Sequence, residues 1–270
     1  MTNSKKLMVC GCSFSALSIK EEHKGTHFSE IIARRLGWDL INNAYQGCSN
    51  GGIRLQVEEV VRQKPDFAII IPTFFDRTEI PITGLRPDFK NLSWLEFDRF
   101  MKTYTGYDEN KGIDNINYAN CTDPALICEN YVSLVNDWVH PYRRSEPLSP
   151  EVVTAVKQFV TYLYDANWKK QQDRWIIEQG MLELKHNNIP FIMIPTLSLW
   201  KYFDKKPRML DEKYYTTDET YCPLKVSGLP EFDVSANEWK NDPGYHTNHA
   251  GQEHIADKYI ELMKERWDIC

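Results

Sequence analysis

Four residues of the types that carry out nucleophilic catalysis stand where strand and helix signals in the sequence change. Ser13 and Gly47 each follow a short apolar run, and Asp242 and His246 precede the last amphipathic stretch of the chain. A serine hydroxyl attacks a carbonyl carbon when a histidine takes its proton, an aspartate orients the imidazole and backbone N–H groups stabilise the oxyanion. These residue types indicate a nucleophilic serine with a histidine base.

The elements that must position these residues alternate between strands and helices. Apolar runs predict strands at 7–10, 40–44, 66–71 and 189–194. Helical spacing predicts helices at 26–36 with Thr26 as its cap, from Ser49 or Asn50 to 63, at 151–185 with a break near 165–167, and at 250–267. Such alternation is typical of an α/β fold with a parallel sheet.

The candidate residues fall at one edge of this predicted sheet, where the carboxyl ends of parallel strands meet and ligands bind. Each residue alone also has an ordinary explanation. Ser13 could be a helix cap, and Gly47 could be a turn residue. Asp242 stands before a proline, where it could open a turn, and His246 could lie at the surface. Their common edge and their order along the chain favour the catalytic interpretation.

Two stretches, 78–148 and 199–240, interrupt the alternation. Both are rich in polar and aromatic residues, and their hydrophobic periodicity is weak. Long connections after strand ends usually shape or cover a site. We therefore expect a single domain over residues 1–270 with two insertions.

Composition excludes several functional classes. The 270 residues are 42% hydrophobic and 26% charged with a net charge of −6, which is enough apolar sequence for a sizeable core. Mild acidity argues against a broad nucleic-acid surface. No apolar run approaches the roughly 20 residues of a membrane span, and the first residues lack a secretory apolar core. We expect a soluble, cytoplasmic protein that binds neither nucleic acid nor membrane.

The seven cysteines are scattered and odd in number, which favours reduced thiols over a disulfide framework. Cys10 and Cys12 share one face of a predicted strand, but no second Cys or His pair stands near them in sequence. His23 and His27 are an isolated pair of possible ligands. We expect neither a metal nor a cofactor.

The strand ends and the C-terminal segment resemble the sequence blocks of the SGNH hydrolases of the GDSL family. In the first block, Gly11-Cys12-Ser13 matches Gly-Asp-Ser except that Cys replaces Asp. Gly47 matches the glycine of the second block. The last block, Asp-x-x-His followed by Asn and Gly, is matched by His246, Asn248 and Gly251, with Asp242 four residues before the histidine instead of three.

The third block departs from the family pattern, Gly-x-Asn-Asp, whose Asn side chain donates to the oxyanion. This chain has Thr73-Phe74-Phe75-Asp76-Arg77 after the third strand. Thr73, Asn50 and Arg77 are the candidate replacements. The alternative is that the chain has the family's fold but no catalytic activity.

The resemblance implies a three-layer α/β/α sandwich with a mostly parallel, flavodoxin-like SGNH sheet. It also implies hydrolysis of ester bonds without a cofactor. Ser13 would be the nucleophile, His246 the base and Asp242 the residue that orients it, with the N–H groups of Ser13 and Gly47 as oxyanion donors. His249 is a competing base, although it is expected to begin the last helix.

The substrate class is suggested by aromatic residues in the insertions, which stack on sugar rings in many binding sites; the alternative is that they only pack the insertions. They are Trp94, Tyr104, Tyr107, Trp138, Tyr142, Trp200, Tyr202 and Trp239. Together with the resemblance they favour an esterase that removes acetyl groups from a glycan.

Two alternatives remain at this stage. The first is a non-catalytic SGNH-like binding or assembly protein; divergent family members occur among tailed bacteriophages, which would place this chain in a host cytoplasm or virion. The second is a nucleotide-binding protein, but the stretch 47–52 matches neither G-x-G-x-x-G nor the P-loop.

Overall fold

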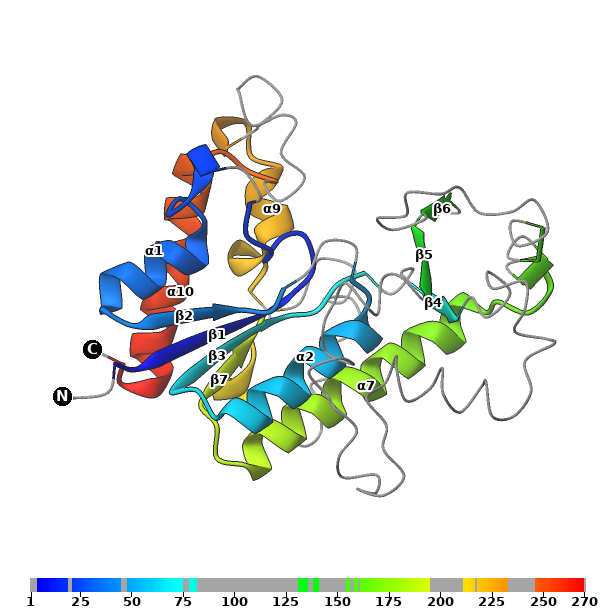
Figure 1. Cartoon of the computed structure of the whole chain (residues 1–270), viewed down its shortest axis with the longest axis horizontal. Coiled ribbons are helices and arrows are strands. Elements are labelled where there is room, and N and C mark those ends of the chain that lie inside the picture. Colours follow the sequence, from blue (N-terminus) through cyan, green and yellow to red (C-terminus); the bar gives the residue numbers. More distant parts are fainter. Residues whose placement is uncertain are drawn as a thin grey trace, which may run out of the picture. The chain divides into compact units, whose positions relative to one another are not determined.

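The described strands form two separate sheets, one in each of two compact units (Figure 1). The units are Met1–Phe75 with Asp173–Cys270, and Asp76–Gln172. The computed structural model describes residues 4–18, 21–44, 48–74, 78–81, 131–135, 138–140, 154–155, 158–159, 161–194, 211–216, 218–232 and 246–269.

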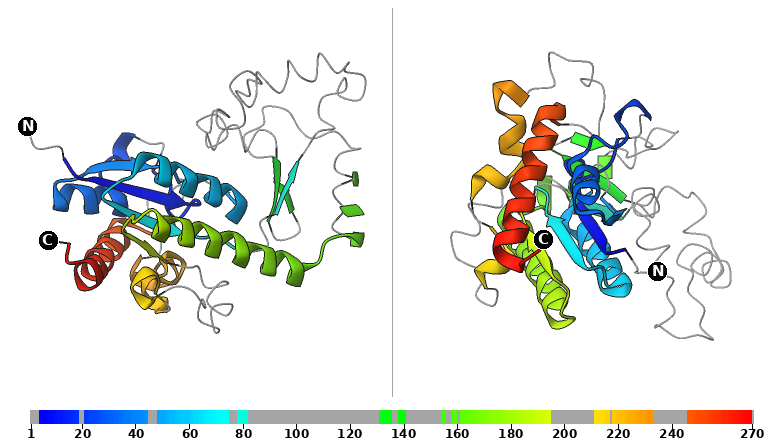
Figure 2. Two further views of the ribbon diagram at one scale, coloured as in Figure 1. Left: turned by 90° about the horizontal axis from the view of Figure 1, so that it is seen from below. Right: turned by 90° about the vertical axis from the view of Figure 1, so that its left-hand side faces the viewer.

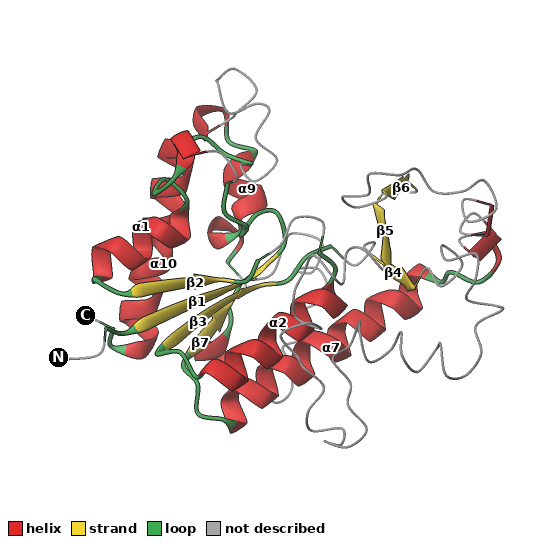
Figure 3. Cartoon of the chain, viewed as in Figure 1, coloured by secondary structure: helices red, strands yellow, loops and turns green. Residues whose placement is uncertain are grey.

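The sheet of the first unit is entirely parallel, with strand order β2-β1-β3-β7 (Figure 3). Its strands are β1 (Lys6–Gly11), β2 (Asp39–Asn42), β3 (Phe67–Ile71) and β7 (Phe191–Met193). All four predicted strands are therefore confirmed, and so is the α/β class. After β1 the chain adds β2 on one side and β3 on the other, so the topological switch point lies between β1 and β3.

Helices cover both faces of this sheet (Figure 2). Alternate strand residues face opposite ways: Leu7 and Ile69 pack with α1 (Phe28–Leu36) and α10 (His249–Trp267), whereas Met8 and Ile70 pack with α2 (Asn50–Gln63) and α7 (Ala166–His186). Because both faces are covered, all five residues of β3 are buried, as expected from its continuous apolar run.

The helix ends follow the sequence signals with one exception. Ser49 caps α2 by accepting from Gly52 N–H at 3.4 Å, and α7 begins at Ala166, inside the predicted break. The prediction that Thr26 caps α1 is wrong. His27 is the cap: its Nδ1 accepts from Ser29 N–H, while the Thr26 hydroxyl donates to the carbonyl of His23.

With one exception near the start of the chain, the remaining elements lie in the two stretches predicted as insertions. The second unit contains an antiparallel sheet of β4 (Thr78–Pro81), β5 (Tyr131–Val135) and β6 (Trp138–His140). Residues 211–232 form the short helices η4 (Glu212–Tyr214), η5 (Glu219–Tyr221), α9 (Pro223–Ser227) and η6 (Pro230–Phe232), and η1 spans Glu21–His23. A single domain with two insertions remains a prediction.

No helix in the described part of the chain is long and apolar enough to cross a membrane. Cys10, Cys12, Cys48 and Cys222 are buried free thiols. Burial, together with the nearby Glu59 carboxylate, raises the pKa of Cys10 far above the ordinary range of a thiol. A thiol held neutral in this way is a poor nucleophile and metal ligand, so Cys10 acts as an apolar core residue.

Candidate active site

Ser13 and His246 meet at the carboxyl end of the parallel sheet. Ser13 lies in the turn that follows β1, and His246 lies in the short segment that precedes α10. The distance between His246 Nε2 and Ser13 Oγ is 2.8 Å, which is a hydrogen-bond distance. A contact of this length between a hydroxyl and an imidazole is the geometry in which a histidine takes the proton of a serine nucleophile.

The backbone on both sides of Ser13 is held by hydrogen bonds. The buried Gln56 side chain of α2 accepts from Gly11 N–H at 2.7 Å and donates from Nε2 to the Gly11 carbonyl at 3.2 Å. Beyond the serine, the N–H groups of Ser15 and Ala16 donate to the Cys12 carbonyl at 2.9 and 3.0 Å. The serine therefore stands on a turn whose entry and exit are both constrained.

Gly11 is required because the turn folds back against the end of β1. A Cβ at this position would lie 2.5 Å from Ser15 Oγ and 3.0 Å from the Ile71 carbonyl oxygen. The first distance is shorter than a real Cβ tolerates, and the second is tight against a carbonyl of the neighbouring strand, which cannot easily move. The glycine of the first block thus allows the tight turn that presents Ser13.

His246 is held by the residues that follow it. The Thr247 hydroxyl and the Asn248 N–H both donate to the carbonyl of Phe232, at 2.9 and 3.0 Å. The Asn248 side chain caps α10 by accepting from Gly251 N–H at 2.9 Å. The Asn and Gly of the last block thus fix the start of α10, and with it the position of the histidine.

Gly251 is the second glycine whose missing side chain matters. A Cβ here would overlap the Thr247 hydroxyl and would lie 3.1 Å from Phe232 Cβ. We expect Gly251→Ala to lower the free energy of unfolding by about 1–3 kcal/mol through overpacking, although Ala is ordinarily the better helix former. Urea unfolding followed by circular dichroism measures this change.

The matched control is Gly228→Ala, at the end of α9. Its φ is −85°, and a Cβ there would meet nothing nearer than the Lys225 carbonyl oxygen at 3.5 Å. We expect this variant to unfold within about 0.5 kcal/mol of wild type. Equal stability of the two alanine variants would contradict the assignment of Gly251.

Phe14 contacts the imidazole directly. Its ring stacks on His246 with centroids 3.9 Å apart and an interplanar angle of 25°. The Phe14 and Phe74 rings form an edge-type pair with centroids 6.4 Å apart. The stack restricts rotation of the imidazole. The sequence reasoning did not select Phe14 as a functional residue, and the only signal for it was its position next to Ser13.

His249, the competing base, is the first residue of α10, as the sequence predicted. Its side chain is about half exposed, and its Nε2 lies 3.4 Å from a carboxylate oxygen of Glu253, one turn further along the helix. The imidazole found at hydrogen-bond distance from Ser13 is that of His246.

Asn50 and Thr73 form a buried polar cluster with Asp173 of α7. Asn50 Oδ1 accepts from Thr73 N–H at 2.8 Å, and its Nδ2 donates to the Thr73 carbonyl at 3.1 Å and to Asp173 Oδ2 at 3.0 Å. All three residues are completely buried. Asp173 was missed by the sequence reasoning, because an Asp within a helix usually faces solvent.

The other candidates lie outside the described residues. Gly47, Arg77 and Asp242 are among them, and so are the aromatic residues of the insertions, apart from Trp138 in β6, whose side chain is not described. The structure thus brings Ser13 and His246 together and places Asn50 beside Thr73.

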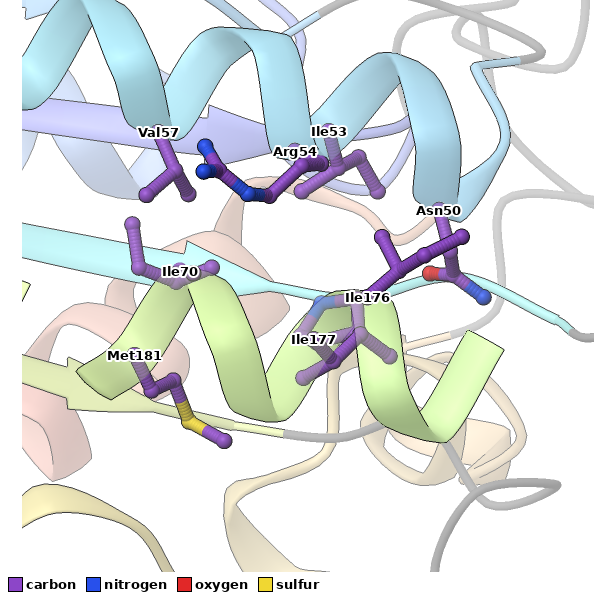
Figure 4. Close-up of a pocket in the computed structure, with 10 residues that line it drawn as sticks. Asn50, Ile53, Arg54, Val57, Ile70, Ile176, Ile177 and Met181 are labelled. Carbon is purple, nitrogen blue, oxygen red and sulfur yellow. The ribbon is translucent and has the colours of Figure 1, made fainter. Parts of the chain in front are cut away.

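A small cavity lies between α2 and α7 and borders on Asn50 (Figure 4). Its walls are mostly apolar, with Ile53, Val57 and Ile177 among them, and its volume is about 10 Å³. That space holds about one water molecule, far less than the several hundred Å³ of a ligand pocket. It is therefore a packing defect between two helices.

Among the residues that the structure describes, no group of three or more His, Cys, Asp or Glu could hold a metal ion. His23 and His27 are both buried. His27 caps α1 as described above, and His23 Nδ1 lies 3.4 Å from the Ser18 hydroxyl.

Comparison of the chain with protein-family models and with curated proteins gives no match. The resemblance to SGNH hydrolases therefore depends on the sequence blocks themselves.

Proposed function

We propose that the chain is an SGNH-type serine hydrolase that cleaves ester bonds, with Ser13 as nucleophile and His246 as base. The observation that carries the proposal is the 2.8 Å distance between Ser13 Oγ and His246 Nε2, formed by residues 233 positions apart in sequence. Its place supports the same conclusion, because Ser13 follows β1 at the switch point, where open parallel sheets bind ligands.

The proposed fold is the three-layer, flavodoxin-like SGNH sandwich with insertions at 78–148 and 199–240. Two observations support it: the strand order β2-β1-β3-β7, which is that of the first four flavodoxin-like strands, and the helices on both faces of the sheet.

The proposed reaction has two steps. Ser13 Oγ attacks the ester carbonyl while its proton passes to His246 Nε2, and the N–H groups of Ser13 and Gly47 stabilise the oxyanion. The tetrahedral intermediate collapses, and the leaving alcohol takes the proton from His246. Water then attacks the acyl carbonyl and gives a proton to His246. The bond between the acyl carbon and Ser13 Oγ breaks, Ser13 takes the proton back from His246 and the acid leaves, with Asp242 orienting the imidazole throughout.

The proposed substrate is an acylated glycan, and the bond cleaved is that of an O-acetyl group. This choice rests on the aromatic residues of the insertions, since aromatic rings stack on sugars. The proposed location is the cytoplasm, or the host cytoplasm or virion if the chain is encoded by a phage.

A second function, binding or assembly without catalysis, is favoured by one observation. The third family block lacks the Asn that donates to the oxyanion, and removal of one such donor commonly lowers kcat by about 100- to 1,000-fold.

The deciding experiment is labelling of purified protein with a fluorophosphonate, which reacts with activated serines. We expect labelling of the folded wild type at Ser13, located by peptide mass spectrometry, and none of Ser13→Ala or of heat-denatured protein. Labelled wild type justifies a panel of acetylated glycans. Absence of label on folded wild type would favour the binding protein.

A further inference from the structure

The hydroxyl of Thr73 is buried near the candidate site, and no described residue forms a hydrogen bond with it. Thr73 is completely buried, and its Oγ1 has no hydrogen-bond partner within the described part of the chain. A buried hydroxyl without a partner costs free energy, because it has lost its hydrogen bonds to water. Such a group at a candidate site calls for a functional explanation.

Strand register brings the segments that carry Ser13 and Thr73 to the same edge of the sheet. The last paired residues of β1 and β3 are Gly11 and Ile71, so Ser13 and Thr73 each stand two residues beyond the pair. One residue further on, the rings of Phe14 and Phe74 are in contact. The strand pair before the two residues and the ring pair after them therefore hold the segments of Ser13 and Thr73 next to each other at the carboxyl end of the sheet.

The buried cluster determines which groups remain available. Asn50 occupies both the N–H and the carbonyl of Thr73, and the two hydrogens of its amide go to Thr73 and Asp173. Asn50 therefore has no hydrogen left for a substrate. The Thr73 hydroxyl is the group of this cluster that is left to donate, on a backbone that the cluster holds rigid.

We propose that Thr73 Oγ1 donates a hydrogen bond to the oxyanion of the tetrahedral intermediate, in place of the side-chain amide that the third block of the family supplies. This inference rests on the proposed hydrolase function. A fixed donor in a water-excluded position stabilises developing negative charge without reorganising. Asn50 and Asp173 are then positioning residues, which act through the Thr73 backbone.

The test is the substitution Thr73→Val, which keeps the shape of the side chain and removes the hydroxyl. We expect the rate constant for fluorophosphonate labelling of Ser13, and kcat for p-nitrophenyl acetate, to fall by about 100-fold. Because the hydroxyl loses no partner among the residues that the structure describes, the melting temperature should stay the same or rise. Thr73→Ser keeps a donor and should restore most of the rate.

Ser15→Ala is the matched control. Ser15 Oγ is likewise completely buried and without a partner among the described residues, two positions from Ser13. We expect this variant to be labelled at the wild-type rate. A loss of rate in Ser15→Ala as large as that in Thr73→Val would overturn the assignment to Thr73.

Labelling of Thr73→Val at the wild-type rate would overturn this inference and leave the hydrolase proposal intact. If Thr73→Val does not fold, Thr73→Ala takes its place, and a wild-type rate in that variant has the same meaning. Folded wild-type protein that carries no label on Ser13 would overturn the hydrolase proposal itself and the role of Thr73 with it.

Discussion

Replacement of His246 by Ala is expected to lower kcat/KM for p-nitrophenyl acetate by about 10³- to 10⁶-fold. The physical reason is that the 2.8 Å contact with Ser13 Oγ is lost, so nothing accepts the proton as the hydroxyl attacks. Fluorophosphonate labelling should fall in parallel, because it needs the same activated hydroxyl. A time course of fluorophosphonate labelling measures the labelling rate, and a spectrophotometric ester assay on the same protein sample measures kcat/KM.

The control for this prediction is His249→Ala. His249 lies only three residues away, but its side chain is half exposed and faces Glu253. We expect its activity and labelling to remain close to those of wild type. The base would have to be reassigned if His249→Ala abolished activity while His246→Ala did not. Because Phe14 stacks on the His246 ring, unfolding curves of both variants must accompany the rates.

The second large effect is expected from Gln56→Leu, which removes the side chain that holds both backbone groups of Gly11. Leu fills a similar volume but neither accepts from Gly11 N–H nor donates to its carbonyl. Each buried group left without a partner costs about 1–3 kcal/mol, so the free energy of unfolding should fall by about 2–6 kcal/mol. Denaturant unfolding at a fixed temperature measures this loss.

The folded fraction of Gln56→Leu should also label more slowly than wild type, because the turn that carries Ser13 has lost its anchor on α2. Gln63→Leu is the matched control on the same helix. Gln63 is exposed and bonds only to the Glu59 side chain among the contacts described, so its loss should cost about 1 kcal/mol or less. Equal destabilisation by the two substitutions would show that Gln56 does not anchor the turn.

Both predictions concern residues held by partners far away in sequence. Ser13 contacts His246 across the length of the chain, and Gln56 reaches Gly11 from a helix 45 residues further on. Local sequence signals could suggest that Ser13 and His246 belong together, because both match family blocks. They could not indicate Gln56, because a glutamine inside an amphipathic helix ordinarily faces solvent.

The sequence by itself determined the order of the elements. Short apolar runs marked β1, β2, β3 and β7, and the cap residue Ser49 marked the start of α2. These signals act within a few residues along the chain, so they are readable from sequence. The wrong prediction of Thr26 as the cap of α1 has the same origin. Two adjacent residues could both cap the helix, and in the structure the imidazole of His27 does so.

Only the tertiary structure decided which side chains engage one another at the site. In the folded chain, His246 lies at hydrogen-bond distance from Ser13, and His249 lies next to Glu253. The Asn50 side chain accepts a hydrogen bond from the Thr73 backbone. These outcomes depend on hydrogen bonds and packing between segments that no local period connects. A buried polar group takes whichever partner the fold brings within reach, and that choice is made when the strands and helices assemble.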